Sequence, residues 1–88
     1  MQTTYSNPIA NFLTTGKKDS KGREIGYVVV FCDNGTDFRT YVQNTRRVNG
    51  EWQEFGVQQR SKSFASQDAA TLWAYKTAKE RIAKVQAN

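Results

Sequence analysis

The chain has 88 residues, with 13 lysines and arginines against 8 acidic residues, no histidine and a net charge of +5. This length suits one domain with one core, and an apolar fraction of 38% is too high for a disordered chain. Because Cys32 is the only cysteine and histidine is absent, an internal disulfide and the usual zinc sites are excluded. The positive charge favours an anionic partner, nucleic acid ahead of an acidic protein or a membrane surface.

The beginning of the chain has no apolar segment of the kind found in secretory signals, and no stretch approaches membrane-spanning length. We therefore expect a cytoplasmic protein with no membrane partner. Residues 1–8 are polar and we expect them to be flexible. A single domain should follow over residues 9–88.

Ile9 to Thr15 is a short apolar run that suits an edge strand or an arm packed on the domain. A basic loop bounded by Gly16 and Gly22 comes next. The clearest strand runs from Glu24 to Cys32, because it is rich in β-branched and aromatic residues. We expect Cys32, inside this run, to be a small buried hydrophobe without reactivity.

Two Asn-Gly pairs predict hairpin turns, since a type I′ turn needs positive φ at both central residues. A two-residue turn at Asn34-Gly35 would pair positions whose numbers sum to 69. The expected pairs are Phe31 with Phe38, Val29 with Thr40 and Tyr27 with Val42. A turn at Asn49-Gly50 would pair positions that sum to 99. The expected pairs are Val42 with Val57, Asn44 with Phe55, Tyr41 with Gln58, Arg39 with Arg60 and Arg47 with Trp52.

Both turns assign the same residues to one apolar face, because side chains alternate along a strand. This predicted core face comprises Ile25, Tyr27, Val29, Phe31, Phe38, Val42, Phe55 and Val57. It predicts a three-stranded antiparallel meander, with residues 9–15 as a candidate fourth strand. Phe64 has the wrong parity for this face, so we expect a bulge between Gln58 and Phe64, or an early strand end, that turns it inward.

A long helix is predicted from Gln67 to Gln86, with Ser66 as N-cap and Asp68 in the first turn. One stripe of this helix should face the sheet, formed by Thr71, Ala74, Tyr75, Ala78, Ile82 and Val85. Trp73 lies off the stripe. Either the N-terminal arm covers it or it belongs to an interface, and we favour the arm. The same arm could instead cover the apolar margin at Val28 and Val30.

The sheet face away from the helix is predicted to be basic and aromatic. Its candidate nucleic-acid-binding residues are Arg39, Tyr41, Arg47, Trp52, Gln58, Arg60 and Lys62. Arginine and lysine supply phosphate contacts, and aromatic rings stack on bases or sugars. The alternative is that Arg47 stacks on Trp52 as a cross-strand pair and the rest is an ordinary solvated face. Glu54 and the apolar margin count against the binding interpretation.

Enzymatic chemistry lacks its usual residues: there is no histidine, no second thiol, no glycine-rich phosphate loop before a helix and no cluster of carboxylates. We therefore expect a protein that is not an enzyme and that has no cofactor and no metal.

The segment from Ser63 to Ala70, followed by Trp73-Ala74-Tyr75, resembles the ethylene-response-factor type of DNA-binding domain over residues 26–83. It is also similar to the arm-type DNA-binding domains of phage and transposon integrases. Phe64, Ser66, Ala70 and Ala78 fall where that pattern has its strand-closing phenylalanine, helix cap and packing alanines. The resemblance implies that the sheet contacts the major groove on its face away from the helix, through Arg39, Arg47, Trp52 and Arg60.

The predicted fold is thus α+β, an antiparallel β-meander of three to four strands packed against one long C-terminal α-helix. The favoured function is binding of nucleic acid, most simply duplex DNA. The first alternative is a protein-binding inhibitor or adaptor of the kind encoded by phages and mobile elements, with exposed tryptophan and arginine as contact residues. The second is a binder of single-stranded nucleic acid.

Overall fold

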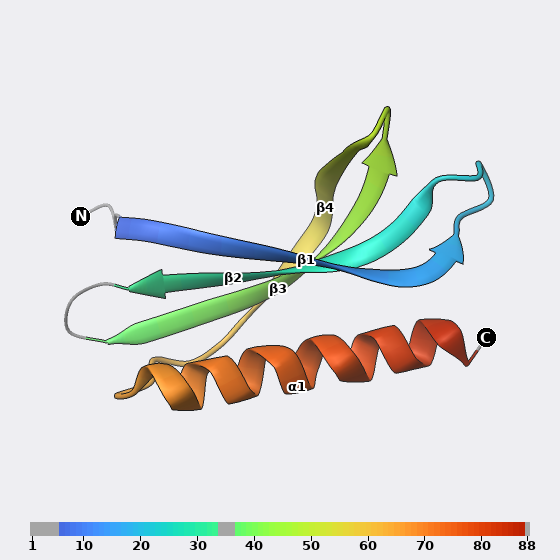
Figure 1. Cartoon of the computed structure of the whole chain (residues 1–88). Coiled ribbons are helices and arrows are strands. Elements are labelled where there is room, and N and C mark those ends of the chain that lie inside the picture. Colours follow the sequence, from blue (N-terminus) through green and yellow to red (C-terminus); the bar gives the residue numbers. More distant parts are fainter. Residues whose placement is uncertain (1–5, 34–36, 88) are drawn as a thin grey trace.

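The computed structural model describes residues 6–33 and 37–87, which form one antiparallel sheet and one helix (Figure 1). The elements are β1 (Ser6–Lys18), β2 (Glu24–Asp33), β3 (Phe38–Val48), β4 (Glu51–Arg60) and α1 (Gln67–Gln86). The strands lie in the order β1-β2-β3-β4. The predicted α+β meander is confirmed, and the N-terminal run is its fourth strand, longer at both ends than residues 9–15. Residues 1–5 lie outside the described part of the chain.

The core lies between the sheet and α1, which runs along one face (Figure 1). Tyr27, Val29 and Val42 of the sheet meet Ala74 and Ala78 of the helix, and all five are buried. The small alanines allow close approach of helix and sheet. Partly buried side chains complete this core: Leu13, Phe31, Trp73, Ile82 and Val85. The predicted helix stripe therefore faces the sheet.

The helix begins as predicted, with the Ser66 Oγ accepting a hydrogen bond from the backbone N–H of Ala69 at 3.2 Å. Trp73 packs against the core beneath the helix. Trp73, expected off the sheet-facing stripe, thus joins the helix-side core, and the N-terminal segment is a paired strand whose side chains alternate between faces. Leu13 accordingly joins the helix-side core, while Phe12 contacts Trp52 on the other face.

The β2–β3 register differs from the prediction by two residues. Paired positions sum to 71, so Val29 lies opposite Val42 and Phe31 opposite Thr40. The predicted Phe31–Phe38, Val29–Thr40 and Tyr27–Val42 pairs are therefore wrong. The strands pair up to Asp33 and Phe38, which makes the connection longer than a two-residue turn. The Asn34-Gly35 turn itself lies outside the described residues. Because the shift is by an even number, every side chain keeps its predicted face.

The β3–β4 turn is as predicted, since Asn49 and Gly50 have φ angles of 52° and 81°. Near the turn, Arg47 pairs with Trp52 and Asn44 with Phe55, which confirms the predicted register. Glycine and asparagine tolerate these left-handed conformations, and the turn can therefore close in two residues.

Farther along β4 the predicted register fails. Asn44 pairs with Phe55, but Val42 pairs with Gln59. Three residues of β4 therefore lie opposite a single residue of β3, and the first of them, Gly56, has a φ of 78°. Tyr41 consequently pairs with Arg60. The predicted Val42–Val57, Tyr41–Gln58 and Arg39–Arg60 pairs are wrong. Val57 is not a core residue either, because the irregular segment leaves it 86% exposed.

The predicted irregularity before Phe64 is confirmed. β4 ends at Arg60, and Phe64 then forms an isolated bridge to Phe38 through two backbone hydrogen bonds of 2.9 Å. The residue numbers of the Tyr41–Arg60 pair sum to 101, whereas those of the Phe38–Phe64 pair sum to 102. One additional residue thus reverses the parity and brings Phe64 opposite Phe38.

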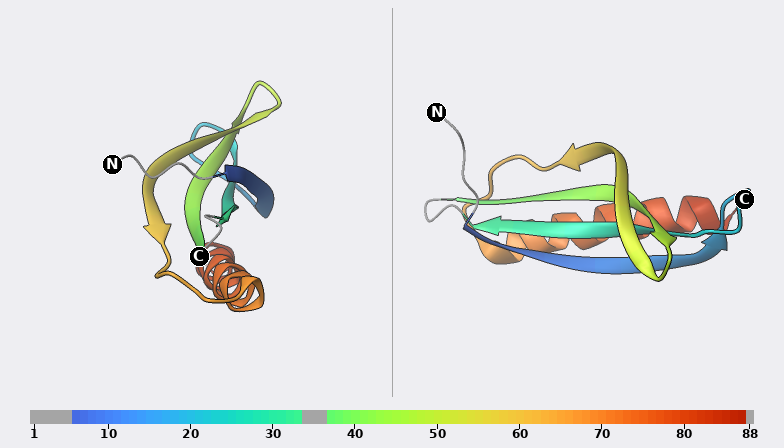
Figure 2. Two further views of the ribbon diagram at one scale, coloured as in Figure 1. Left: turned by 90° about the vertical axis from the view of Figure 1, so that its left-hand side faces the viewer. Right: turned by 90° about the horizontal axis from the view of Figure 1, so that it is seen from above.

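The β3–β4 hairpin is not flat. Viewed from above, its tip crosses over β2 and β1 on the face away from the helix (Figure 2). The open basic sheet surface expected from the sequence is therefore interrupted by the hairpin itself. This bend decides how the candidate site is divided.

Candidate nucleic-acid interface

Most of the predicted binding residues share the sheet face away from the helix. Arg39, Tyr41 and Arg47 occupy odd-numbered positions of β3, so they point to the same face. On β4, Arg60 pairs with Tyr41 and Trp52 pairs with Arg47. The bent hairpin separates them into two groups. The hairpin group consists of Arg47 and Trp52; the pocket group consists of Arg39, Tyr41, Gln58 and Arg60. Lys62 belongs to neither, because its Nζ lies 5.5 Å from the centre of the Phe64 ring.

Trp52 of the hairpin group is held by two ring contacts, and one of its partners, Arg47, also approaches a carboxylate. Its ring is stacked on Phe12 of β1, with centroids 6.3 Å apart and planes 8° from parallel. The guanidinium of Arg47 lies 5.1 Å from the Trp52 ring centre, so the cross-strand cation–π pair weighed as an alternative is present. Arg47 Nη1 also lies 3.6 Å from Glu24 Oε1. Trp52 therefore fixes the hairpin on the sheet.

Gly26 provides the space for the Trp52 ring. A Cβ atom at this position would lie 3.1 Å from two Trp52 ring atoms and 2.3 Å from the carbonyl oxygen of Leu13. Only a residue without a side chain allows both approaches. The sequence carried a signal for this, since a glycine within a strand pattern indicates a close approach.

The apolar margin of this face is buried without an N-terminal arm folding over it. Val28, Val30 and Cys32 form a second cluster, and Tyr41 of β3 packs against it. Nearby, the buried Gln43 donates from Nε2 to the carbonyl oxygen of Gly56 at 2.9 Å, which ties the irregular part of β4 to β3. The margin is thus part of the folded core and not an open binding surface.

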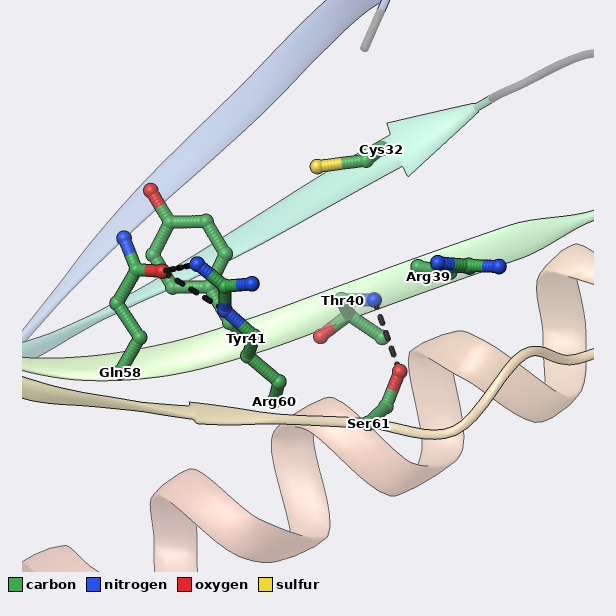
Figure 3. Close-up of a pocket in the computed structure, with 7 residues that line it drawn as sticks. All are labelled: Cys32, Arg39, Thr40, Tyr41, Gln58, Arg60 and Ser61. Atoms are coloured by element: carbon green, nitrogen blue, oxygen red, sulfur yellow. Dashed lines mark hydrogen bonds between the residues drawn. The ribbon is translucent and has the colours of Figure 1, made fainter. Parts of the chain in front are cut away.

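The pocket group surrounds a cavity of about 270 Å³ beside the end of β4 (Figure 3). Its lining residues are Cys32, Arg39, Thr40, Tyr41, Gln58, Arg60 and Ser61. Gln58 and Arg60 lie near Tyr41, and Arg39 lies farther along β3 (Figure 3). The lining thus combines two guanidinium groups with hydroxyl and amide groups and includes no carboxylate.

Hydrogen bonds hold most of these side chains. Arg60 donates from Nε and Nη2 to the Gln58 Oε1, at 3.1 and 2.9 Å. Ser61 Oγ accepts from the backbone N–H of Thr40 at 3.0 Å. Arg39 forms an ion pair with Asp37, from Nε to Oδ2 at 3.1 Å. Arg60 in particular is oriented by a neighbour that carries no charge.

Cys32 is 4% exposed, and burial raises the pKa of its thiol. The predicted buried cysteine is confirmed. A raised pKa leaves very little thiolate at neutral pH, so the geometry offers no nucleophile here.

The described residues contain no group of three or more histidine, cysteine, aspartate or glutamate side chains that could hold a metal ion. Among the same residues, no helix has the length and apolarity needed to cross a membrane.

Comparisons of the chain with protein-family models, with curated proteins and with solved structures give no significant match. The resemblance to ethylene-response-factor-type domains therefore stays a prediction.

Proposed function

We propose that this protein is a non-enzymatic cytoplasmic nucleic-acid-binding protein that contacts duplex DNA with the sheet face away from α1. The observation that carries the proposal is that Arg39, Arg47 and Arg60 are all exposed on this one face. A buried free thiol at Cys32 suits a reducing compartment.

These arginines can exchange their present partners for phosphate. The Arg39–Asp37 pair is partly exposed, and Arg47 and Glu24 are 3.6 Å apart. Exposed ion pairs contribute little to stability, about 0–1 kcal/mol. A phosphate group, like a carboxylate, accepts two parallel hydrogen bonds from one guanidinium, so it can replace either of these weak pairs. Tyr41 and Gln58 add a hydroxyl and an amide beside Arg60, and Lys62 adds charge next to β4.

The shape of the hairpin supports duplex DNA over other anions. The β3–β4 hairpin projects from the sheet on the side away from the helix (Figure 1). The major groove of B-DNA admits a two-stranded β-ribbon of this kind. Arg47 lies near its tip, and Trp52 acts as a positioning residue by holding the ribbon against Phe12.

Fluorescence anisotropy with labelled DNA tests the proposal. We expect saturable binding to a mixed-sequence duplex that weakens as salt rises, with log K falling linearly against log salt concentration. A single strand of the same sequence serves as comparison, and tighter binding to it would favour the single-strand alternative. Absence of salt-sensitive binding to either DNA below about 100 μM, the weak limit of ordinary non-specific affinity, would contradict the proposal.

A second candidate, binding to a protein partner, is favoured by Val57. Its side chain is 86% exposed in the irregular part of the edge strand β4. The unpaired side of an edge strand is a surface to which a partner chain can add a strand. If the protein binds a protein partner through this edge, Val57→Ser should abolish that binding and leave DNA binding and stability unchanged.

A further inference from the structure

The cavity beside the end of β4 is lined by two arginine side chains, Arg39 and Arg60, and by no carboxylate. Arg39 is paired with Asp37, which lies outside the lining, whereas Arg60 bonds to the neutral Gln58 within it. At about 270 Å³ it is larger than a bound water needs and partly enclosed by the sheet face and β4. A cavity with two guanidinium groups is suited to a small anion.

We infer that this pocket binds one phosphate group, held by the guanidinium groups of Arg60 and Arg39. The ligand class is a phosphate ester, whose oxygens accept the charge-assisted hydrogen bonds that arginine donates.

The neighbours of Arg60 prepare it for this role. Gln58 Oε1 accepts two bonds from Arg60, at 3.1 and 2.9 Å, which fixes the plane of the guanidinium. The same contact leaves the Gln58 Nε2 amide and the Arg60 Nη1 as donors. Ser61, bonded to the backbone of Thr40, closes the cavity next to Arg60. An oriented guanidinium loses less side-chain entropy when an anion binds.

The inference rests on the proposed function, because DNA is the source of phosphate that it assumes. Two kinds of DNA phosphate share the required chemistry, the backbone phosphodiester and the terminal phosphomonoester. Lys79 lies on α1, outside the pocket and outside the proposed DNA-binding face, and its exposed side chain provides a charge-removing control.

The test is a nuclear magnetic resonance titration of the ¹⁵N-labelled full chain with inorganic phosphate, at an ionic strength kept constant with chloride. We expect saturable shifts of the backbone amides of Tyr41, Arg60 and Ser61 and of the Arg60 Nε–H. Arg60→Gln should weaken phosphate binding by about tenfold or more, as expected for a lost hydrogen bond to a charged group. Lys79→Gln should change phosphate binding less than about twofold. Arg60 is exposed, and its replacement should leave the remaining spectrum unchanged.

A second titration uses one duplex with and without 5′-phosphates. Equal shifts at the pocket identify a backbone phosphate as ligand, and shifts that require the 5′-phosphate identify a terminal one. Unsaturable phosphate shifts, or equal effects of Arg60→Gln and Lys79→Gln, would overturn the inference even when the duplex binds. Saturable phosphate binding without any binding of DNA would instead uphold the pocket and overturn the proposed function.

Discussion

The close approach at Gly26 leads to the most specific prediction for stability. In Gly26→Ala, the new methyl group would lie 2.3 Å from the Leu13 carbonyl oxygen and 3.1 Å from two atoms of the Trp52 ring. The backbone of β1 cannot yield as a flexible side chain can. We therefore expect β1 to separate from β2 locally and the Trp52 ring to leave its place on Phe12.

The expected cost follows from these two effects. Overpacking of a filled site costs about 1–3 kcal/mol, and a lost aromatic pair adds about 0.5–1.5 kcal/mol. Together they predict a loss of roughly 2–4 kcal/mol in the free energy of unfolding, large for a domain whose total is about 5–15 kcal/mol. For a domain of this size the melting temperature should fall by roughly 8–30 °C.

Thermal and urea unfolding, followed by circular dichroism and tryptophan fluorescence, measure this loss. Gly56→Asn is the control, because no atom lies within 4 Å of the added Cβ and asparagine tolerates the φ of 78°. Gly56→Asn should lower the free energy of unfolding far less than Gly26→Ala does. A stability of Gly26→Ala within about 0.5 kcal/mol of the wild type, the usual range for harmless surface changes, would refute the reasoning.

Three further predictions concern the hairpin turn, the buried thiol and a loop carboxylate. Gly50→Val should cost about 1–3 kcal/mol, because a β-branched side chain resists the φ of 81°, and an unchanged melting temperature would show that this strain is absent. Cys32 should react slowly with a maleimide in the native protein and rapidly in urea; fast native labelling would mean that its sheet face opens. Hydrogen bonds from the backbone and side chain of Arg23 lower the pKa of Asp19 in the folded protein. The Asp19 carboxylate therefore stabilises the fold above its unfolded-state pKa, and this stabilisation is lost as pH falls through the lower pKa of the folded state. Asp19→Asn should accordingly destabilise the protein at pH 7 and approach the wild type well below pH 3.8, whereas a difference independent of pH would contradict this.

The fold was predictable because turns and alternation act locally. Asn49-Gly50 determined both the turn and the pairs beside it, and the parity of β2 and β3 determined which side chains face the helix. The β2–β3 register was not predictable to the residue, since the length of that connection depends on how the strands twist and pair over their full length. The even shift preserved the faces.

The candidate site was only partly predictable. The alternation of side chains along the strands placed the arginines on one face. The bend of the hairpin across that face, however, depends on contacts among three residues that are far apart in the sequence. Gly26, Phe12 and Trp52 lie on three different strands, and no local pattern connects them. The division into a hairpin group and a pocket group likewise follows from the irregularity at Gly56, whose glycine was the only local signal.

The central claim, that the sheet face away from α1 binds DNA, is tested most directly by two triple variants that remove the same charge from opposite sides. The sheet-face variant removes three positive charges by changing Arg39, Arg47 and Arg60 to glutamine. The helix variant removes three from the exposed side of α1 by changing Lys76, Lys79 and Lys84 to glutamine. Each variant lowers the net charge from +5 to +2, since three positive charges are removed. We expect the sheet-face variant to lose most of its affinity for duplex DNA. The slope of log K against log salt concentration should fall by up to about 0.9 for each phosphate contact removed, while the helix variant keeps the slope of the wild type. Equal losses in both variants, or a larger loss in the helix variant, would contradict it.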